Sequence, residues 1–100
     1  MEKFVYYNYL FDIYGNLLTE KNAKIFSLYY GENLSMQEIA DLMQVSKSFV
    51  GTSIKNTENK LNDLESKLHI NATNQELEKI LNLQDIKEIK NIIEKLLNGE

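Results

Sequence analysis

The sequence predicts an all-α protein, a helical bundle without strands. Two observations carry this prediction. The 100 residues contain no proline and only four glycines, so few residues interrupt a helix. Apolar residues recur at spacings of three and four through most of the chain, which is the pattern of a helix with one buried face. We therefore expect six helices, of which the last two are either separate or one bent helix.

Two helices are expected in the first 31 residues. The first spans residues 2–14, and Gly15 with Asn16 is expected to end it with the usual left-handed C-terminal cap. The expected inward side chains of this helix are Phe4, Tyr7, Leu10, Phe11 and Tyr14. Thr19 opens the second helix and Gly31 ends it. Its expected inward side chains are Ala23, Phe26 and Tyr30, with Ile25 and Tyr29 beside them.

A short helix and a long one are expected next. Ser35 and Glu38 have the S-x-x-E spacing of a capping box, in which each side chain bonds the other residue's backbone N–H. They predict a helix over residues 36–43. Ser46 is placed to cap a long helix over residues 46–68. The apolar rhythm of the long helix consists of Val50, Ile54, Thr57, Leu61, Leu64 and Leu68.

The C-terminal thirty residues are expected to form the last two helical segments. Residues 69–74 are predicted as a polar junction, and Thr73 with Glu76 as a second capping box at its end. Asp85 is placed to start the last helix, and Gly99 to end it. The apolar residues of this part are Leu77, Ile80, Leu81, Ile86, Ile89, Ile93, Leu96 and Leu97.

Residues 36–55 have the pattern of a helix-turn-helix. Ala40 is small where the two helices would cross most closely, and Gln44 stands at the turn position usually given to glycine. The predicted core of the motif is Ile39, Ala40, Met43, Val45, Val50 and Ile54. An ordinary αα-corner in a helical bundle shares this apolar pattern and is the alternative.

A helix-turn-helix places its second helix in the major groove of DNA, so helical spacing selects the residues that face the ligand. The nucleic-acid-binding candidates are Ser46, Lys47, Ser48, Thr52, Lys55 and Lys60. Residues 42–57 contain no carboxylate, although the whole chain has a formal charge of −4 and all eleven basic residues are lysines. Gly51 leaves a bare spot on this surface. The alternative is a solvated helix face without a ligand.

Several apolar residues are candidates for contacts with another protein. Phe49 is expected either to pack under the N-terminal aromatic helix or to mark a protein-binding surface. The long helix and the C-terminal segment each carry an apolar stripe, and one small domain has difficulty covering both. The candidate interaction residues are Phe49, Leu61, Leu64, Leu68, Ile86, Ile89 and Ile93. We therefore expect a homodimer through the C-terminal half, and the alternative is that residues 75–98 fold back on the long helix.

The composition argues against an enzyme, a metal site and a membrane protein. There is no cysteine, and His69 is the only histidine, so a zinc site lacks ligands. No glycine-rich phosphate loop or catalytic triad is visible, and no cofactor is expected. No apolar run is long enough to span a bilayer, so we expect a cytoplasmic protein without membrane insertion.

Three stretches carry a resemblance to a known family. They are NYLFDIYGNLLT at 8–19, LYYGENLSMQEIADLMQVSKSFV at 28–50 and IKNTENKLNDLESKLHI at 54–70. In these residues the chain resembles the YlxM-like family of small bacterial helix-turn-helix proteins, whose fold looks like region 4 of sigma factors. The resemblance covers roughly residues 1–70, where we expect the helix-turn-helix domain. Residues 71–100 would then be a helical extension that packs on this domain or on a partner subunit.

The resemblance implies a regulatory nucleic-acid-binding protein connected with the signal recognition particle pathway. The implied partners are DNA and the RNA or protein components of that particle. Family members usually carry an arginine where Lys47 stands, and a basic pair where Lys55 and Asn56 stand. The other function that the residues allow is a protein-interaction adaptor, which would use a helix-turn-helix scaffold without binding DNA.

Overall fold

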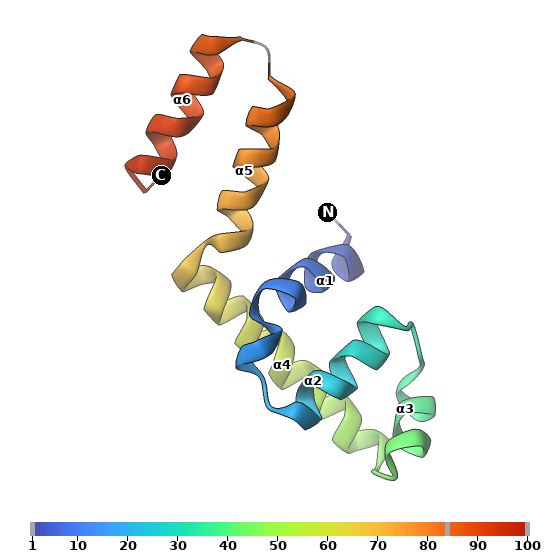
Figure 1. Cartoon of the computed structure of the whole chain (residues 1–100). Helices are drawn as coiled ribbons and strands as arrows, with labels where there is room; N and C mark the ends of the chain where they lie inside the picture. The colour runs from blue at the N-terminus through green and yellow to red at the C-terminus, as the bar shows by residue number, and fades with distance from the viewer. Residues whose placement is uncertain (1, 84, 100) are drawn as a thin grey trace. The chain divides into compact units, whose positions relative to one another are not determined.

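The computed structural model describes residues 2–83 and 85–99, and every regular element within them is a helix (Figure 1). The prediction of an all-α fold is confirmed for these residues. In chain order the elements are α1 (Lys3–Tyr14), the 3₁₀ helix η1 (Gly15–Leu17), α2 (Glu20–Phe26), the π-helix η2 (Ser27–Gly31), α3 (Met36–Met43), α4 (Lys47–Leu68), α5 (Ile70–Asn82) and α6 (Ile86–Leu97).

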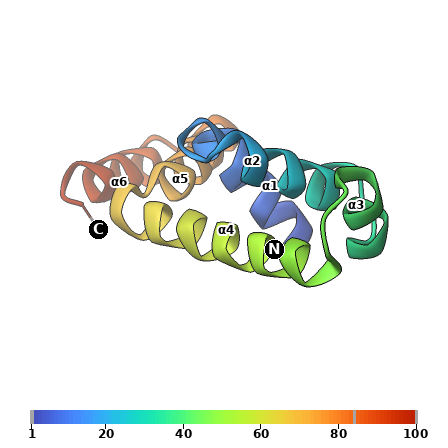
Figure 2. The same cartoon turned by 90° about the horizontal axis from the view of Figure 1, so that it is seen from below.

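The chain divides into two compact units, Met1–Leu68 and His69–Glu100, which we call unit 1 and unit 2. Unit 1 is built around α4, against which α1, α2 and α3 all pack (Figure 2). Its buried apolar side chains are Leu10, Tyr14, Ile25, Phe26, Leu28, Tyr30, Ile39, Ala40, Val50, Ile54 and Leu61. One long helix therefore contributes to the core that three other helices complete.

The first helix ends at Tyr14 as predicted, but by a different mechanism. Gly15 keeps a right-handed conformation, with φ −56° and ψ −31°, and its N–H donates to the carbonyl of Phe11 as a further helical residue would. The N–H of Leu18 then donates to the carbonyl of Gly15 at 3.1 Å and closes η1. The prediction of a left-handed cap is wrong, because the chain tightens into a 3₁₀ turn instead.

Phe4 is the exception among the expected inward side chains of α1. It is 39% exposed, and its ring centroid lies 4.8 Å from that of Tyr30 and 5.7 Å from that of Tyr29. Contacts of this kind between tilted aromatic rings add to the free energy of burial. Phe4 therefore covers an aromatic cluster from outside rather than filling the core.

The second helix confirms the predicted start and corrects the predicted buried face. The hydroxyl of Thr19 accepts from the N–H of Asn22 at 3.3 Å. From Ser27 the helix widens into η2, where the N–H of Glu32 donates to the carbonyl of Ser27 at 3.0 Å. A widened turn changes the rotation of the side chains that follow it. Leu28, which α-helical spacing alone did not place inward, is buried.

Buried tyrosines bond to carboxylates on α4. The hydroxyl of Tyr14 donates to Glu65 Oε1 at 2.7 Å, and that of Tyr30 donates to Glu58 Oε2. Burial raises the pKa of Tyr30 and the bond to Glu58 raises it further, so the hydroxyl stays protonated as the donor. These two bonds tie α1 and η2 to α4.

Two hydroxyls on the buried side of α4 differ in their partners. Ser53 Oγ donates to Asn22 Oδ1 at 2.8 Å. Thr57 Oγ1 is buried without a hydrogen-bond partner among the described residues. A buried unpaired hydroxyl costs free energy because it has lost its contacts with water without replacement.

We expect Thr57→Val to raise the free energy of unfolding by about 1 kcal/mol, since valine has a similar shape without the unpaired hydroxyl. The matched control is Ser53→Ala, which removes a bonded hydroxyl from the same side of α4 and should lower the free energy of unfolding by about 1 kcal/mol. Urea denaturation followed by far-ultraviolet circular dichroism measures both. A destabilised Thr57→Val variant would show that this hydroxyl has a partner in solution.

Unit 2 is a hairpin of two antiparallel helices, α5 and α6 (Figure 1). Helix α5 begins directly after His69, whose φ of 55° and ψ of 26° are left-handed. The N–H of Thr73 donates to the carbonyl of His69 at 2.9 Å, so Thr73 lies in the first turn of α5. The predicted polar junction over residues 69–74 and the predicted capping box of Thr73 with Glu76 are therefore wrong. A single left-handed residue other than glycine leaves no signal in the sequence pattern.

The last helix begins and ends where the sequence predicts. The Asp85 side chain accepts from the N–H of Lys87 at 2.9 Å. At the other end Gly99 is left-handed, with φ 75°, and its N–H donates to the carbonyl of Leu96 at 3.3 Å. Helices α5 and α6 are separate rather than one bent helix.

Candidate nucleic-acid interface

Helix α3 begins with the predicted capping box. The Ser35 hydroxyl accepts from the N–H of Glu38 at 3.1 Å, and Glu38 Oε1 accepts from the N–H of Ser35 at 3.0 Å. The backbone N–H of Ser35 lowers the pKa of Glu38, and the Ser35 hydroxyl lowers it further. The carboxylate form is thereby favoured at the start of the helix, where the helix dipole also attracts a negative charge.

The turn between α3 and α4 depends on one left-handed residue. Gln44 has φ 58° and ψ 46°, the conformation that glycine usually supplies at this position. The N–H of Val45 donates back to the carbonyl of Ala40 at 3.0 Å, which ends α3. The Ser46 hydroxyl then accepts from the N–H of Phe49 at 3.0 Å, which caps α4 as predicted.

The predicted core of the helix-turn-helix is present. Its buried members are Ile39, Ala40, Val50 and Ile54, and the partly buried members that pack against them are Met43 and Val45. Ala40 is only 2% exposed, and α3 packs directly against α4. The small side chain at position 40 therefore matches a close approach of the two helices.

We expect Ala40→Leu to lower the free energy of unfolding by about 1–3 kcal/mol, because the added methyl groups overpack the crossing of α3 and α4. Gln37→Leu is the control, since it adds leucine at an exposed position of the same helix and should change the free energy by less than about 0.5 kcal/mol. Urea denaturation compares the two variants. If Ala40→Leu unfolds at the wild-type urea concentration, the helices do not cross at this residue.

Four of the predicted nucleic-acid contacts lie exposed on the first turns of α4. We call them the α4 face, and they are Lys47, Ser48, Thr52 and Lys55. Positions 48, 52 and 55 are spaced by four and three, so they share one side of the helix, turned away from the buried Val50 and Ile54. The hydroxyls of Ser48 and Thr52 and the ammonium group of Lys55 therefore lie on one side of α4, and Lys47 lies exposed at its first residue. The helix dipole favours anions at the first turn, which holds Lys47 and Ser48.

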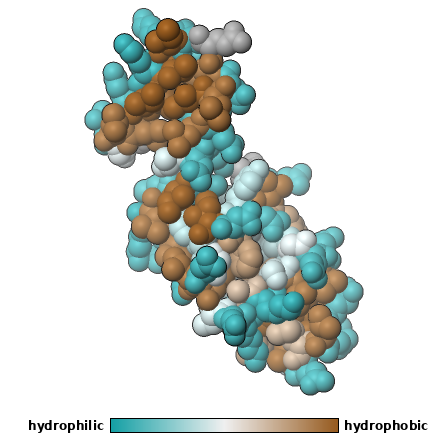
Figure 3. Space-filling model, in the orientation of Figure 1, coloured by the Kyte–Doolittle hydropathy of each residue, from teal (hydrophilic) through white to brown (hydrophobic). Residues whose placement is uncertain are grey.

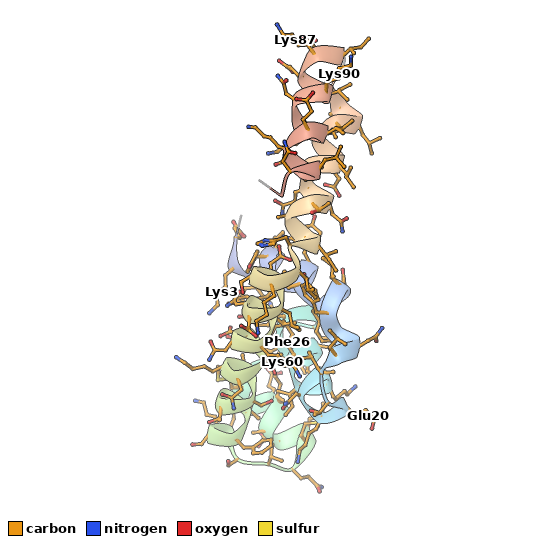
Figure 4. The ribbon with its side chains drawn as sticks, turned by 90° about the vertical axis from the view of Figure 1, so that its left-hand side faces the viewer. Lys3, Glu20, Phe26, Lys60, Lys87 and Lys90 are labelled. Atoms are coloured by element: carbon orange, nitrogen blue, oxygen red, sulfur yellow. The ribbon has the colours of Figure 1, made fainter. Side chains whose placement is uncertain are left out.

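Lys60, also predicted as a nucleic-acid contact, lies outside the α4 face, and its contact with nucleic acid stays a prediction. Its Nζ donates to the carbonyl of Leu17 in η1 at 3.0 Å, within unit 1 (Figure 4). A separation of five residues also turns its side chain by about 140° from that of Lys55. From the sequence alone, Lys60 groups with the other lysines of the helix. Spacing alone does not reveal a hydrogen-bond partner 43 residues away.

Phe49 is 42% exposed, and its expected packing under the N-terminal helix is wrong. Its ring lies beside α2, where Lys21 Nζ is 4.7 Å from the ring centroid. A cation over an aromatic face is attracted by the ring quadrupole. Lys21 thus places a third lysine next to the helix-turn-helix, and no sequence signal connects it with Phe49.

The leucine stripe of α4 is mostly covered by unit 1 itself. Leu61 is fully buried, and Leu64 is partly buried against the core. Leu61 is therefore unavailable to a partner, and its prediction as an interaction residue is wrong, because α1 packs on α4. Leu68 is 52% exposed.

The interaction residues predicted in α6 differ in their exposure. Ile86 and Ile93 are exposed, whereas Ile89 is partly buried. Helices α5 and α6 contact each other within unit 2, which accounts for the partial burial of one side of α6. Ile86 and Ile93 therefore remain accessible on this helix.

Gly51 lies on α4 beside the α4 face, and packing does not require a glycine there. A Cβ added at this position would meet Met36 Sδ at 3.7 Å, an ordinary van der Waals contact. The residue is helical, so no unusual backbone conformation demands glycine either. Glycine within a helix lowers stability relative to alanine by roughly 0.5–1 kcal/mol.

We expect Gly51→Ala to raise the free energy of unfolding by roughly 0.5–1 kcal/mol, through the higher helix propensity of alanine. Asn59→Ala, at an exposed position of the same helix, should give a smaller gain because asparagine is a better helix former than glycine. Thermal and urea denaturation measure both changes. A loss of stability in Gly51→Ala would mean that Met36 cannot accommodate the added methyl group.

The described residues contain no group of three or more side chains suited to hold a metal ion. None of the described helices combines the length and the apolar character that a membrane crossing needs.

The fold and the α4 face together define a helix-turn-helix protein. The family described as "Putative helix-turn-helix protein, YlxM / p13 like", UPF0122, matches residues 1–98. The chain belongs to this family, which confirms the resemblance carried by its residues. The match continues through α6, beyond the residues 1–70 that carried the resemblance.

Curated relatives from several bacteria are similar over most of their length. A UPF0122 protein of Halalkalibacterium halodurans is 43% identical over 88 residues, which are 88% of this chain and 79% of that protein. A UPF0122 protein of Oceanobacillus iheyensis is 41% identical over 81 residues, which are 81% of this chain and 77% of that protein. A UPF0122 protein of Bacillus thuringiensis is 42% identical over 81 residues, which are 81% of this chain and 74% of that protein.

Proposed function

We propose that unit 1 is a regulatory nucleic-acid-binding module without catalytic activity, and that α4 enters the major groove of duplex DNA. The observation that carries this proposal is the α4 face, where Lys47, Ser48, Thr52 and Lys55 lie exposed on the second helix of a helix-turn-helix. Membership of a helix-turn-helix family supports the same conclusion. Such motifs place the first turns of the second helix against the bases and the adjacent phosphates.

The chemistry of the α4 face favours phosphate contacts over base recognition. Lysine ammonium groups and hydroxyls bind phosphate oxygens, and the helix dipole adds to this attraction. The guanidinium fork that most often reads guanine is absent, since the chain has no arginine. Gly51 also presents no side chain to a base. We therefore propose weak, strongly salt-dependent binding with little sequence preference from this face alone.

The proposal has three further parts that rest on the resemblance or on affinity arguments. From the resemblance we also propose a connection with the signal recognition particle, whose RNA would be a second candidate ligand, and a cytoplasmic location. Residues 1–70 would bind the nucleic acid, and residues 71–100 would pack on a partner subunit. A homodimer would strengthen binding because two linked contacts multiply a weak individual affinity.

The second candidate function is a protein-interaction adaptor. Leu42 and Phe49, both near the helix-turn-helix, are 62% and 42% exposed. Exposed apolar side chains near one motif are a feature of protein-binding surfaces. If the protein is an adaptor, the helix-turn-helix serves as a structural scaffold and the α4 face contacts only solvent.

Fluorescence-anisotropy titration across a salt series separates the two functions. The ligands are a labelled duplex DNA and the signal recognition particle RNA. We expect Lys47→Ala with Lys55→Ala to weaken binding and to reduce the slope of log affinity against log salt by about 1.8 for duplex DNA, since each lysine neutralises about one phosphate.

The control is Lys24→Ala with Lys67→Ala, which removes the same charge from exposed positions outside the α4 face. It should leave the salt slope nearly unchanged. If both double variants lose the same affinity, the net charge of the protein, and not the α4 face, causes the binding. If neither the duplex DNA nor the RNA binds detectably at low salt, the adaptor is favoured.

A further inference from the structure

Unit 2 exposes a set of large apolar side chains that its own two helices do not cover. The set consists of Leu77 and Leu81 on α5 and Ile86, Ile93 and Leu97 on α6, which are between 42% and 84% exposed. Their exposed fractions add up to the surface of more than three fully exposed leucine or isoleucine residues. Monomeric proteins rarely leave contiguous apolar patches of this size to water.

These side chains share one side of the hairpin, which we call the hairpin face. Ile80 on α5 and Ile89, Ile92 and Leu96 on α6 are partly buried, as expected of the seam between two contacting helices. When each helix is viewed from its N-terminus, its exposed residues are rotated about the helix axis from its seam residues, and the direction of this rotation is the same for α5 and α6. Because α5 and α6 run antiparallel, this shared sense brings both exposed sets to the same side. Figure 3 shows the resulting apolar surface over α5 and α6.

The hairpin has no core of its own. Among the described residues of unit 2, no apolar side chain is buried, and the only buried residue is the polar Asn71. Two packed helices of this length do not bury enough apolar surface to form a stable unit, and domains gain stability by adding a second layer. The hairpin face therefore needs an occupant.

We propose that the hairpin face binds the hairpin face of a second copy of this chain, and that the four helices form a two-fold symmetric bundle. The charges beside the face allow one complementary pair. Glu78 flanks the face on α5, whereas Lys87, Lys90 and Glu94 flank it on α6, where Lys87 and Lys90 extend outward (Figure 4). Glu94 lies at the level of the uncharged Asn74 of α5. A two-fold axis parallel to the helices places α5 of one copy against α6 of the other. Glu78 then lies at the level of Lys90 of the second copy, on both sides of the bundle.

The composition of the face also suits a dimer. A standard interface buries about 800 Å² on each partner, with an apolar centre and a polar rim. The five apolar residues supply such a centre, and the charged residues supply the rim. Pairs of helices that each expose one apolar side commonly combine into four-helix bundles. This dimer specifies the homodimer that the proposed function includes, and its test does not require nucleic-acid binding, so a failure of one is distinguishable from a failure of the other.

Sedimentation equilibrium of the full chain over a wide range of protein concentrations tests the proposal. We expect a dimer of twice 11.7 kDa. Leu81→Lys and Ile93→Lys should each raise the dimer dissociation constant by about tenfold or more, since each buries a charge in the apolar centre. Leu42→Lys is the matched control, because Leu42 is a 62% exposed leucine in unit 1, and it should leave the constant unchanged.

A charge exchange tests the pairing even if a face variant folds poorly. Glu78→Lys and Lys90→Glu should each weaken the dimer, and the double variant should restore it, since opposite charges again face each other. Circular dichroism checks that each variant keeps its helices. A full-length chain that stays monomeric overturns the proposal, as does a dimer that both Leu81→Lys and Ile93→Lys leave intact. Failure of the double variant to restore the dimer overturns the pairing of α5 with α6.

Discussion

The packing of three helices on one side of α4 is the constraint on which unit 1 depends. Val50, Ile54 and Leu61 are buried on that side, and α1, α2 and α3 each contact the helix. A helix with one side fully committed to the core has its opposite side free of packing demands. The residues of the α4 face can therefore be substituted without loss of the packing that holds unit 1 together.

Tyrosine contacts also shape the electrostatics of α4. Glu58 lies one turn beyond Lys55 and would oppose its charge if it were exposed to the same solvent. Its carboxylate instead accepts from the Tyr30 hydroxyl and lies 3.6 Å from Lys3 Nζ, on a side chain that is 17% exposed. Glu65 is engaged by Tyr14 in the same way. Both carboxylates are thus directed toward other helices of unit 1 and away from the lysines near the N-terminal end of α4.

The sequence predicted the features that depend on local contacts. The capping box of Ser35 with Glu38 and the cap at Ser46 join residues three apart, so the pattern of residue types is enough to find them. Helical spacing likewise predicted the burial of Ile39, Val50 and Ile54. The helix-turn-helix, as a local motif, could therefore be predicted almost completely.

The features that the sequence missed depend on backbone states or on distant partners. The left-handed conformation of His69 and the widened turn at Ser27 belong to residue types that adopt many conformations. Lys60 is held by a carbonyl 43 residues away, and Phe49 lies beside Lys21 of another helix. Only the folded chain brings these groups together. The structure therefore changes which residues surround the α4 face, whereas the α4 face itself consists of residues that the sequence had selected.

All the positive charge of the α4 face is carried by lysine, because the chain has no arginine. Transfer of an acetyl group to a lysine Nζ gives a neutral amide, whereas a guanidinium keeps its charge under methylation. Lys47 and Lys55 are exposed and contribute nothing to the core, so their acetylation would remove both cations and leave unit 1 folded. On the proposed nucleic-acid-binding function, acetylation of these two lysines would therefore lower the affinity of the α4 face, whereas an arginine at position 47 would keep its charge.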